Sequence, residues 1–113
     1  MNKNSYIQLL FGLKQDGIVE AVHYTPSGKI DWVRAYERRG PTWSDHVLLD
    51  RDALVERLEN GKRFFVGKRI PLEASEFEIG ERLKLVKSGK RSFVGTGENH
   101  ITKNDYLKDV PLI

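Results

Sequence analysis

The stretch IVEAVHYTPSGKIDWVRAY, residues 18–36, contains the strongest structural signal in the 113-residue sequence. At its centre, Thr25–Lys29 (TPSGK) places proline where a type I turn needs φ of about −65° and glycine where a left-handed residue must follow. A three-residue loop over 26–28 predicts an antiparallel hairpin. Its expected cross-strand pairs are Tyr24 with Ile30, His23 with Asp31, Val22 with Trp32, and Glu20 with Arg34.

This register predicts which side chains share one face of the hairpin. Alternation along each strand puts six apolar or aromatic residues together, namely Ile18, Val22, Tyr24, Ile30, Trp32 and Tyr36. The polar pairs His23–Asp31 and Glu20–Arg34 would further stabilise the sheet. Residues 6–13 (YIQLLFGL) are predicted to form a further strand, with a helix as the open alternative.

Residues 50–61 predict one helix. Asp50 suits the N-cap because its carboxylate can accept a hydrogen bond from a first-turn amide. Leu54, Val55 and Leu58 form an apolar stripe, and Gly61 suits the left-handed position just after the helix. The preceding segment, residues 37–46 (ERRGPTWSDH), is expected to be a loop because Gly-Pro interrupts it.

A basic phrase then occurs twice, as GKRFFVGKR (Gly61–Arg69) and GKRSFVGTG (Gly89–Gly97). Gly61 would end a helix whereas Gly89 would lie in a turn, so we interpret the phrase as two similar strand starts rather than a structural repeat. Neither copy is a phosphate-binding P-loop. The first has the wrong glycine spacing and carries Arg69 where that motif requires Ser or Thr.

The second copy belongs to a predicted hairpin that turns at Ser88–Gly89. Leu83, Leu85 and Val94 should face the core, whereas the opposite face collects Arg82, Lys84, Val86, Arg91 and Phe93. Cations around an exposed aromatic ring suit single-stranded nucleic acid, because the cations contact phosphates while a base stacks on the ring. The alternative is that Phe93 is buried and the cations line the sheet edge. The candidate nucleic-acid-binding residues are Lys62, Arg63, Arg82, Lys84, Lys90, Arg91 and Phe93.

Charge and composition limit the class of protein. The net charge of +3 is uneven, because residues 1–56 carry 7 Lys+Arg against 8 Asp+Glu, and residues 57–113 carry 12 against 8. A basic half is a mild indication of anionic partners. The chain lacks cysteine, and its histidines, His23, His46 and His100, have no metal-ligand spacing, so we expect no metal and no cofactor. Neither a signal peptide nor a membrane span is recognisable, which predicts a cytoplasmic protein without membrane contact.

Together these patterns predict a single α+β domain over residues 1–113. We expect a mostly antiparallel sheet of five to six strands, with closure into a partial barrel left open, and one helix at about 51–60 packed on it. The favoured function is a small non-enzymatic module that binds an anionic ligand such as single-stranded nucleic acid.

Two other functions stay open. The first is an adaptor for a protein partner or for a second copy of the chain, using Arg38, Arg39 and Trp43, because arginine and tryptophan are frequent in interface hot spots. Trp43 should then be at least partly exposed. The second is a small enzyme with an acid–base pair from the Glu73–Glu81 stretch, which contains Glu73, Glu76, Glu78 and Glu81.

Overall fold

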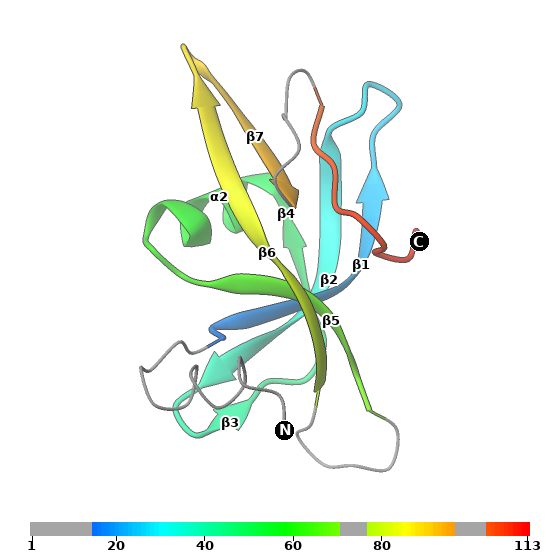
Figure 1. The fold of residues 1–113 in the computed structure, drawn as a ribbon, viewed down its shortest axis with the longest axis vertical. Helices are drawn as coiled ribbons and strands as arrows, with labels where there is room; N and C mark the ends of the chain where they lie inside the picture. Colours follow the sequence, from blue (N-terminus) through cyan, green and yellow to red (C-terminus); the bar gives the residue numbers. More distant parts are fainter. Residues whose placement is uncertain (1–14, 71–76, 97–103) are drawn as a thin grey trace.

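Seven strands and one helix make up the described part of the chain (Figure 1). The structure is a computed structural model that describes residues 15–70, 77–96 and 104–113. The predicted element at residues 6–13 therefore lies outside the described residues. The elements are β1 (Gly17–Tyr24), β2 (Ile30–Arg39), β3 (Thr42–Trp43), β4 (Val47–Asp50), α2 (Arg51–Glu59), β5 (Phe64–Arg69), β6 (Phe77–Ser88) and β7 (Arg91–Thr96).

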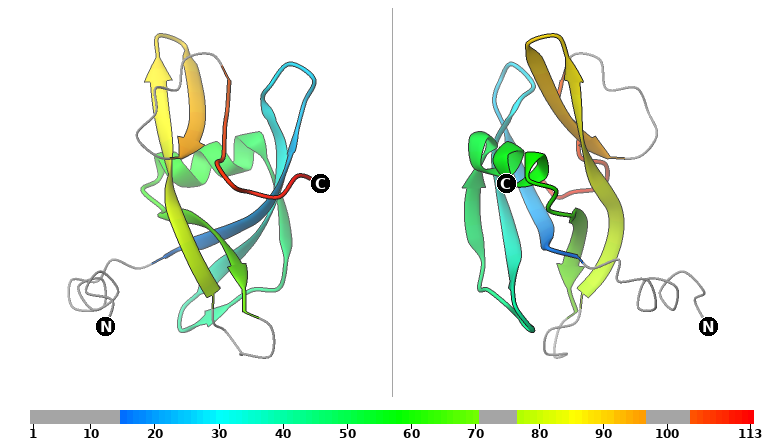
Figure 2. Two further views of the ribbon diagram at one scale, coloured as in Figure 1. Left: turned by 45° about the vertical axis from the view of Figure 1, so that its right-hand side comes forward. Right: turned by 90° about the vertical axis from the view of Figure 1, so that its left-hand side faces the viewer.

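The strands form one curled sheet in the order β3-β2-β1-β5-β6-β7, with β4 also paired to β2. The α+β class is confirmed, but the sheet is mixed, because β1 and β5 run parallel. A parallel pair needs a crossover connection. Between β1 and β5 the chain forms β2, β3, β4 and α2, and β5 then pairs with the edge of β1 that β2 leaves free. The sheet curls like half a barrel, so that hairpins β1–β2 and β6–β7 diverge at one end (Figures 1 and 2).

The predicted first hairpin is present, with a shifted register. Tyr24 pairs with Ile30 as expected, and Gly28 has φ of 85°. A bulge between His23 and Tyr24 then places His23 opposite Trp32 rather than Asp31, because a bulge adds one unpaired residue to one strand. Val22 and Glu20 likewise lose their predicted direct partners. The side chains still reach one another diagonally, with His23 Nδ1 3.2 Å from Asp31 Oδ2 and Arg34 Nε donating to Glu20 Oε1 at 2.8 Å.

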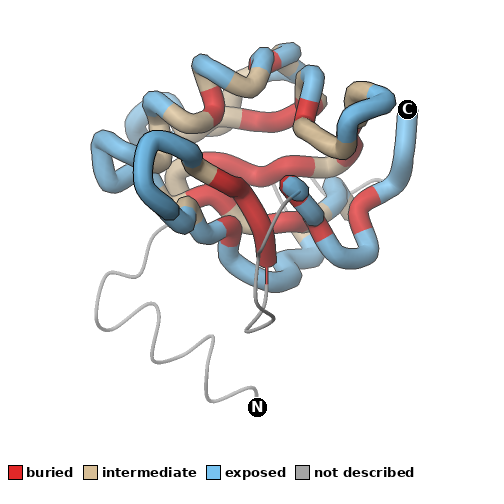
Figure 3. Tube along the Cα trace, turned by 90° about the horizontal axis from the view of Figure 1, so that it is seen from above, coloured by how far each residue is buried: buried red, intermediate tan, exposed pale blue. Residues whose placement is uncertain are grey.

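The hydrophobic core lies inside the curl of the sheet (Figure 3). The predicted shared face is wrong for Trp32, because Val22 pairs with Val33 and Trp32 therefore points to the opposite face of the sheet. Four of the six predicted residues are buried, whereas Tyr24 and Trp32 are only partly buried. Leu54 of the predicted helix stripe is fully buried, and Val55 and Leu58 pack at the edge of the core. The buried cluster consists of Val19, Val22, Ile30, Val33, Ala35, Leu49, Leu54, Phe64, Val66, Leu83, Val94, Leu107 and Val110.

Both predicted ends of the helix are confirmed. Asp50 Oδ1 accepts a hydrogen bond from the amide of Ala53 at 2.8 Å. Gly61 has φ of 82°, its amide donates to the carbonyl of Leu58, and the next amide donates to the carbonyl of Arg57. This pair of bonds is the Schellman arrangement, in which a left-handed residue closes the last turn.

We expect Asp50→Ala to lower the free energy of unfolding by about 0.5–2 kcal/mol, because the Ala53 amide loses its hydrogen-bond acceptor. Urea denaturation followed by circular dichroism would measure the change. Asp52→Ala is the matched control, since Asp52 lies in the first turn and is exposed. Equal costs for the two variants would show that first-turn charge, and not the cap, stabilises the helix.

Three local predictions need correction. Residues 37–46 do not form one loop, because β2 continues to Arg39 and pairs with the short strand β3. Residues 47–50 form strand β4 against β2, and this strand was missed because it is only four residues long. The second hairpin turns at Gly89–Lys90 rather than Ser88–Gly89, because Gly89, with φ of 63°, occupies the first position of the turn. The predicted division of side chains between the two faces of this hairpin still holds, because every cross-strand partner is shifted by two residues and a shift of two keeps a side chain on the same face.

The segment 104–113 joins the two diverging hairpins (Figure 1). The Tyr106 amide donates to the carbonyl of Val94 in β7 at 2.9 Å. The Ile113 amide donates to the carbonyl of Val22 in β1, also at 2.9 Å. This segment therefore brings residues of β1, β2 and β7 together at one end of the molecule.

Candidate anion-binding site

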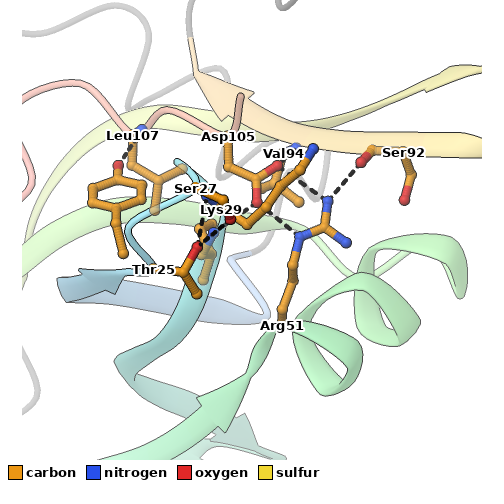
Figure 4. Close-up of polar contacts among 10 residues, drawn as sticks. Thr25, Ser27, Lys29, Arg51, Ser92, Val94, Asp105 and Leu107 are labelled. Carbon is orange, nitrogen blue, oxygen red and sulfur yellow. Dashed lines mark hydrogen bonds and ion pairs between the residues drawn. The ribbon is translucent and has the colours of Figure 1, made fainter. Parts of the chain in front are cut away.

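A buried carboxylate organises the end of the molecule where the hairpins diverge (Figure 4). The Asp105 side chain is 0% exposed. It accepts hydrogen bonds from the amides of Ile30 at 2.8 Å and Val94 at 2.9 Å, and from Arg51 Nε at 2.7 Å and Nη2 at 3.1 Å. One carboxylate thus links β2, β7 and the first residue of α2.

The ionisation of this pair follows from its contacts. Burial alone raises the pKa of Asp105, but the hydrogen bonds from Arg51 and from the two amides outweigh it and hold the pKa below its usual value. The same hydrogen bond with Asp105 raises the pKa of Arg51. Both groups are therefore charged at neutral pH, and the guanidinium is held in a fixed position.

An open hollow of about 520 Å³ lies beside this pair, and we call it the basic hollow. The described residues of its lining supply four cations and two hydroxyl groups, and none of them carries a carboxylate: Ser27, Lys29, Arg51, Lys90, Arg91 and Ser92. Figure 4 shows the side chains of Lys29 and Arg51 extending from different elements into the same region. Arg51 Nη2 also donates to the carbonyl of Ser92 at 2.5 Å, which fixes the guanidinium against β7.

Lys90 and Arg91, predicted from the repeated phrase, both line the basic hollow and are exposed. Phe93, however, is only 2% exposed, and Lys29 Nζ lies 4.0 Å from the centre of its ring. The predicted open stacking face is therefore covered. The cause is the first hairpin, whose Lys29 reaches across to β7, a contact that the local sequence around Phe93 does not reveal.

The two copies of the repeated phrase do not share a surface hollow. Lys62 lines a second hollow of about 240 Å³, together with Arg38, Arg39 and Arg57 and the acidic Asp16 and Glu37. Arg57 Nε donates to Glu37 Oε1 at 2.7 Å, so part of the charge there is neutralised. Lys62 therefore lines the same hollow as Arg38 and Arg39, which the sequence analysis assigned to the partner-binding surface.

The remaining predicted cations lie elsewhere. The amide of Arg63 donates to Asp16 Oδ2 at 2.8 Å, but its side chain does not line either hollow. Arg82 and Lys84 are exposed along β6 and also lie outside both hollows. Of the seven predicted nucleic-acid-binding residues, the structure therefore brings Lys90 and Arg91 together in one hollow.

Trp43 is partly exposed and folds back onto its own chain. Its ring centre lies 5.0 Å from that of Phe77 in β6, and the guanidinium of Arg38 lies 4.4 Å from it. Arg39 is exposed at the end of β2. A partner-binding role for Arg38, Arg39 and Trp43 stays a prediction.

The acidic stretch is described only in part, because Glu73 and Glu76 lie outside the described residues. Glu81 is exposed. The Glu78 carboxylate is 70% exposed and lies 3.9 Å from Lys68 Nζ. Glu78 also lines a hollow of about 310 Å³ that contains Glu20 and Asp109.

A polar cluster surrounds Glu20, of which the sequence predicted only the pair with Arg34. The Glu20 carboxylate, 13% exposed, accepts a hydrogen bond from Arg34 Nε and lies 2.8 Å from His46 Nε2. The same His46 nitrogen contacts the hydroxyl of Tyr36, whose pKa is raised by burial and then by the Glu20 charge. A proton relay needs both ring nitrogens, so this arrangement is not a catalytic triad.

Within residues 15–70, 77–96 and 104–113, no group of three or more His, Cys, Asp or Glu side chains is placed to hold a metal ion. No helix in these same ranges has both the length and the apolar character required to cross a membrane. Comparison with known proteins assigns no family, since no family model, no curated protein and no solved structure matches this chain.

Proposed function

We propose that this protein is a non-enzymatic binding module for an anionic ligand, with single-stranded nucleic acid as the ligand class. The observation that carries the proposal is the basic hollow. Three separate segments supply four cations to it: the β1–β2 turn, the start of α2 and the β6–β7 turn. Among residues 15–70, 77–96 and 104–113, no carboxylate lines it. Cations gathered in this way attract phosphate groups and raise their local concentration.

The two outer cations are available to a ligand. Lys90 and Arg91 are exposed, and no hydrogen bond or ion pair to another described residue engages either side chain. Because Phe93 is covered by Lys29, the binding mode differs from the base stacking expected from the sequence. Contact with phosphates alone carries no base information, so we expect binding that depends weakly on base sequence.

The adaptor and enzyme alternatives have less support. Trp43 already stacks on Arg38 and contacts Phe77, which occupies part of the surface that a partner would use. Glu78 is largely exposed and lies beside Lys68. Paired catalytic carboxylates need a cleft that gives them different environments, and the Glu78 carboxylate is largely exposed.

The salt dependence of binding tests the proposal. A labelled oligo-dT of about 15 nucleotides should bind at about 50 mM salt and weaken as salt rises. Lys90→Ala/Arg91→Ala should reduce the slope of log K against log salt by about 1.4, since each lost phosphate contact removes about 0.7 for single strands. Fluorescence anisotropy measures both quantities.

The repeated phrase supplies a matched control, because Lys62→Ala/Arg63→Ala removes the same two residue types at the other copy. This control should change the slope less than the first double variant, since Lys62 lines a different hollow. Absence of binding at low salt would contradict the proposed function. Equal effects of the two double variants would contradict the assignment of binding to the basic hollow.

A further inference from the structure

We infer that Asp105 positions Arg51 to bind a phosphate in the basic hollow, an inference that rests on the proposed function. Asp105 does not line the hollow and its side chain is 0% exposed, so any effect on a ligand passes through its neighbours. Arg51 does line the hollow, and its side chain is 23% exposed. A buried carboxylate thus strengthens the binding of an anion that it does not touch.

The contacts of Arg51 divide its guanidinium into a held part and a free part (Figure 4). Asp105 accepts hydrogen bonds from Nε at 2.7 Å and from Nη2 at 3.1 Å, which is the planar fork that arginine forms with a carboxylate. The carbonyl of Ser92 accepts a further bond from Nη2 at 2.5 Å. No hydrogen bond to a described residue engages Nη1. A phosphate oxygen can therefore accept from Nη1 while the other two nitrogens hold the side chain in one orientation.

Asp105 is itself held firmly enough to orient another side chain. Its carboxylate accepts hydrogen bonds from the amide of Ile30 in β2 at 2.8 Å and from the amide of Val94 in β7 at 2.9 Å. Backbone groups of two strands therefore fix the carboxylate that in turn fixes Arg51.

The outer cations of the hollow lack this support. Lys90 and Arg91 are exposed, and neither side chain has a hydrogen bond or ion pair with another described residue. Immobilising a long side chain on binding costs conformational entropy, and a side chain that is already held avoids most of this cost. Arg51 therefore offers a phosphate contact at a lower entropic cost than either outer cation.

The charge of Asp105 and its hydrogen bonds to Arg51 have opposite effects on a bound anion. The contacts of Asp105 lower its pKa, so the carboxylate is ionised at neutral pH, and its negative charge repels a phosphate. If charge alone mattered, neutralising Asp105 would strengthen binding. If Asp105 positions Arg51, the same change weakens binding, because the guanidinium loses its fixed orientation.

Asp105→Asn tests the sign of this effect, because it removes the charge and keeps the size of the side chain. We expect the variant to bind an oligo-dT of about 15 nucleotides about three- to tenfold more weakly than the wild-type protein at about 50 mM salt, by fluorescence anisotropy. The slope of log K against log salt should not decrease, because no cation is lost. Asp31→Asn is the matched control, since it changes the net charge equally at a carboxylate that is 51% exposed and does not line the hollow. This control should not weaken binding.

A double-mutant cycle tests whether Asp105 acts through Arg51. Arg51→Ala should itself weaken binding and reduce the salt slope by about 0.7, because one phosphate contact is lost. When Arg51→Ala is already present, adding Asp105→Asn should weaken binding by less than about twofold. An equal loss with and without Arg51 would show that Asp105 has only a structural role, and would overturn the inference. Unchanged or tighter binding by Asp105→Asn alone would also overturn it.

Circular dichroism and the fraction of active protein in a stoichiometric titration establish that each variant is folded. If Asp105→Asn does not fold, Arg51→Lys decides, because it keeps both charges but its ammonium group cannot form the fork with Asp105. We expect a three- to tenfold loss of affinity, again as an order of magnitude of about one immobilised side chain, at an unchanged salt slope. Wild-type affinity of Arg51→Lys would overturn the inference and leave the proposed function intact. No binding by the wild-type protein at low salt would overturn both.

Discussion

Asp105→Ala is expected to lower the free energy of unfolding by about 3–5 kcal/mol, because it breaks a buried ion pair by removing one partner. The variant leaves Arg51 without its counter-charge and the amides of Ile30 and Val94 without acceptors. Each buried amide that loses its partner adds a desolvation cost. The β1–β2 and β6–β7 hairpins and α2 also lose a side chain that contacts all three.

Urea denaturation followed by tryptophan fluorescence would measure this loss, since Trp32 and Trp43 report on β2 and β3. Asp31→Ala is the control, because the Asp31 carboxylate is 51% exposed and contacts only a histidine in the described residues. Its removal should cost less than about 1 kcal/mol. Similar costs for the two variants would show that Asp105 does not hold the segments together.

The pH dependence of the same variant series follows from the lowered pKa of Asp105. A carboxylate with a lowered pKa in the folded state stabilises the protein above its unfolded pKa of about 4, and this contribution disappears as the pH falls through the folded value. The stability difference between the wild-type protein and Asp105→Asn should therefore shrink below about pH 4. A difference that stays constant would contradict the ion pair.

Phe64→Ala should cost about 3–5 kcal/mol, because truncating a buried aromatic side chain removes its burial and leaves a cavity. Phe64 is 1% exposed and pairs in parallel register with Gly17 at the crossing of β5 and β1. The two residues are closely fitted, since a Cβ atom at Gly17 would lie 2.3 Å from the Phe64 ring. No side chain at Gly17 is present to fill the space.

Phe65→Ala is the neighbouring control on the other face of β5, where the side chain is only partly buried. Its cost should be clearly smaller than that of Phe64→Ala in the same urea experiment. If both truncations cost the same, the assignment of the buried face of β5 would be wrong. The two variants thus test which face of β5 is buried where this strand pairs with β1, the only parallel pairing between described strands.

Local signals predicted the elements that depend on local chemistry. Gly28 and Gly61 adopt left-handed conformations, as the turn and the helix end required, and Asp50 caps α2. Features set by distant contacts were not predictable. The bulge at His23 changes the register, but no glycine or proline at that position indicates it in the sequence. The parallel pairing of β1 with β5 depends on where the chain returns to the sheet after α2.

The candidate anion-binding site was likewise predictable only in part. The basic character of Lys90 and Arg91 was evident from the repeated phrase, but the hollow also needs Lys29 and Arg51, which come from elements with unrelated sequence signals. Arg51 is positioned by Asp105, 54 residues away. The sequence left open whether Phe93 is exposed or buried, because alternation along β7 says nothing about a lysine that reaches across from another hairpin.

The docking of the segment 104–113 also has a kinetic consequence. Its bonds close long loops: Asp105 meets Ile30 across 75 residues, and the Leu107 amide meets the Tyr24 hydroxyl across 83. Contacts between residues so far apart form slowly, because the entropy of closing the loop must be overcome before the contact contributes. The β1–β2 hairpin and α2 depend on short-range contacts and can form earlier. We therefore expect Arg51 to gain its fixed orientation late in folding, when the segment 104–113 docks and brings Asp105 to it.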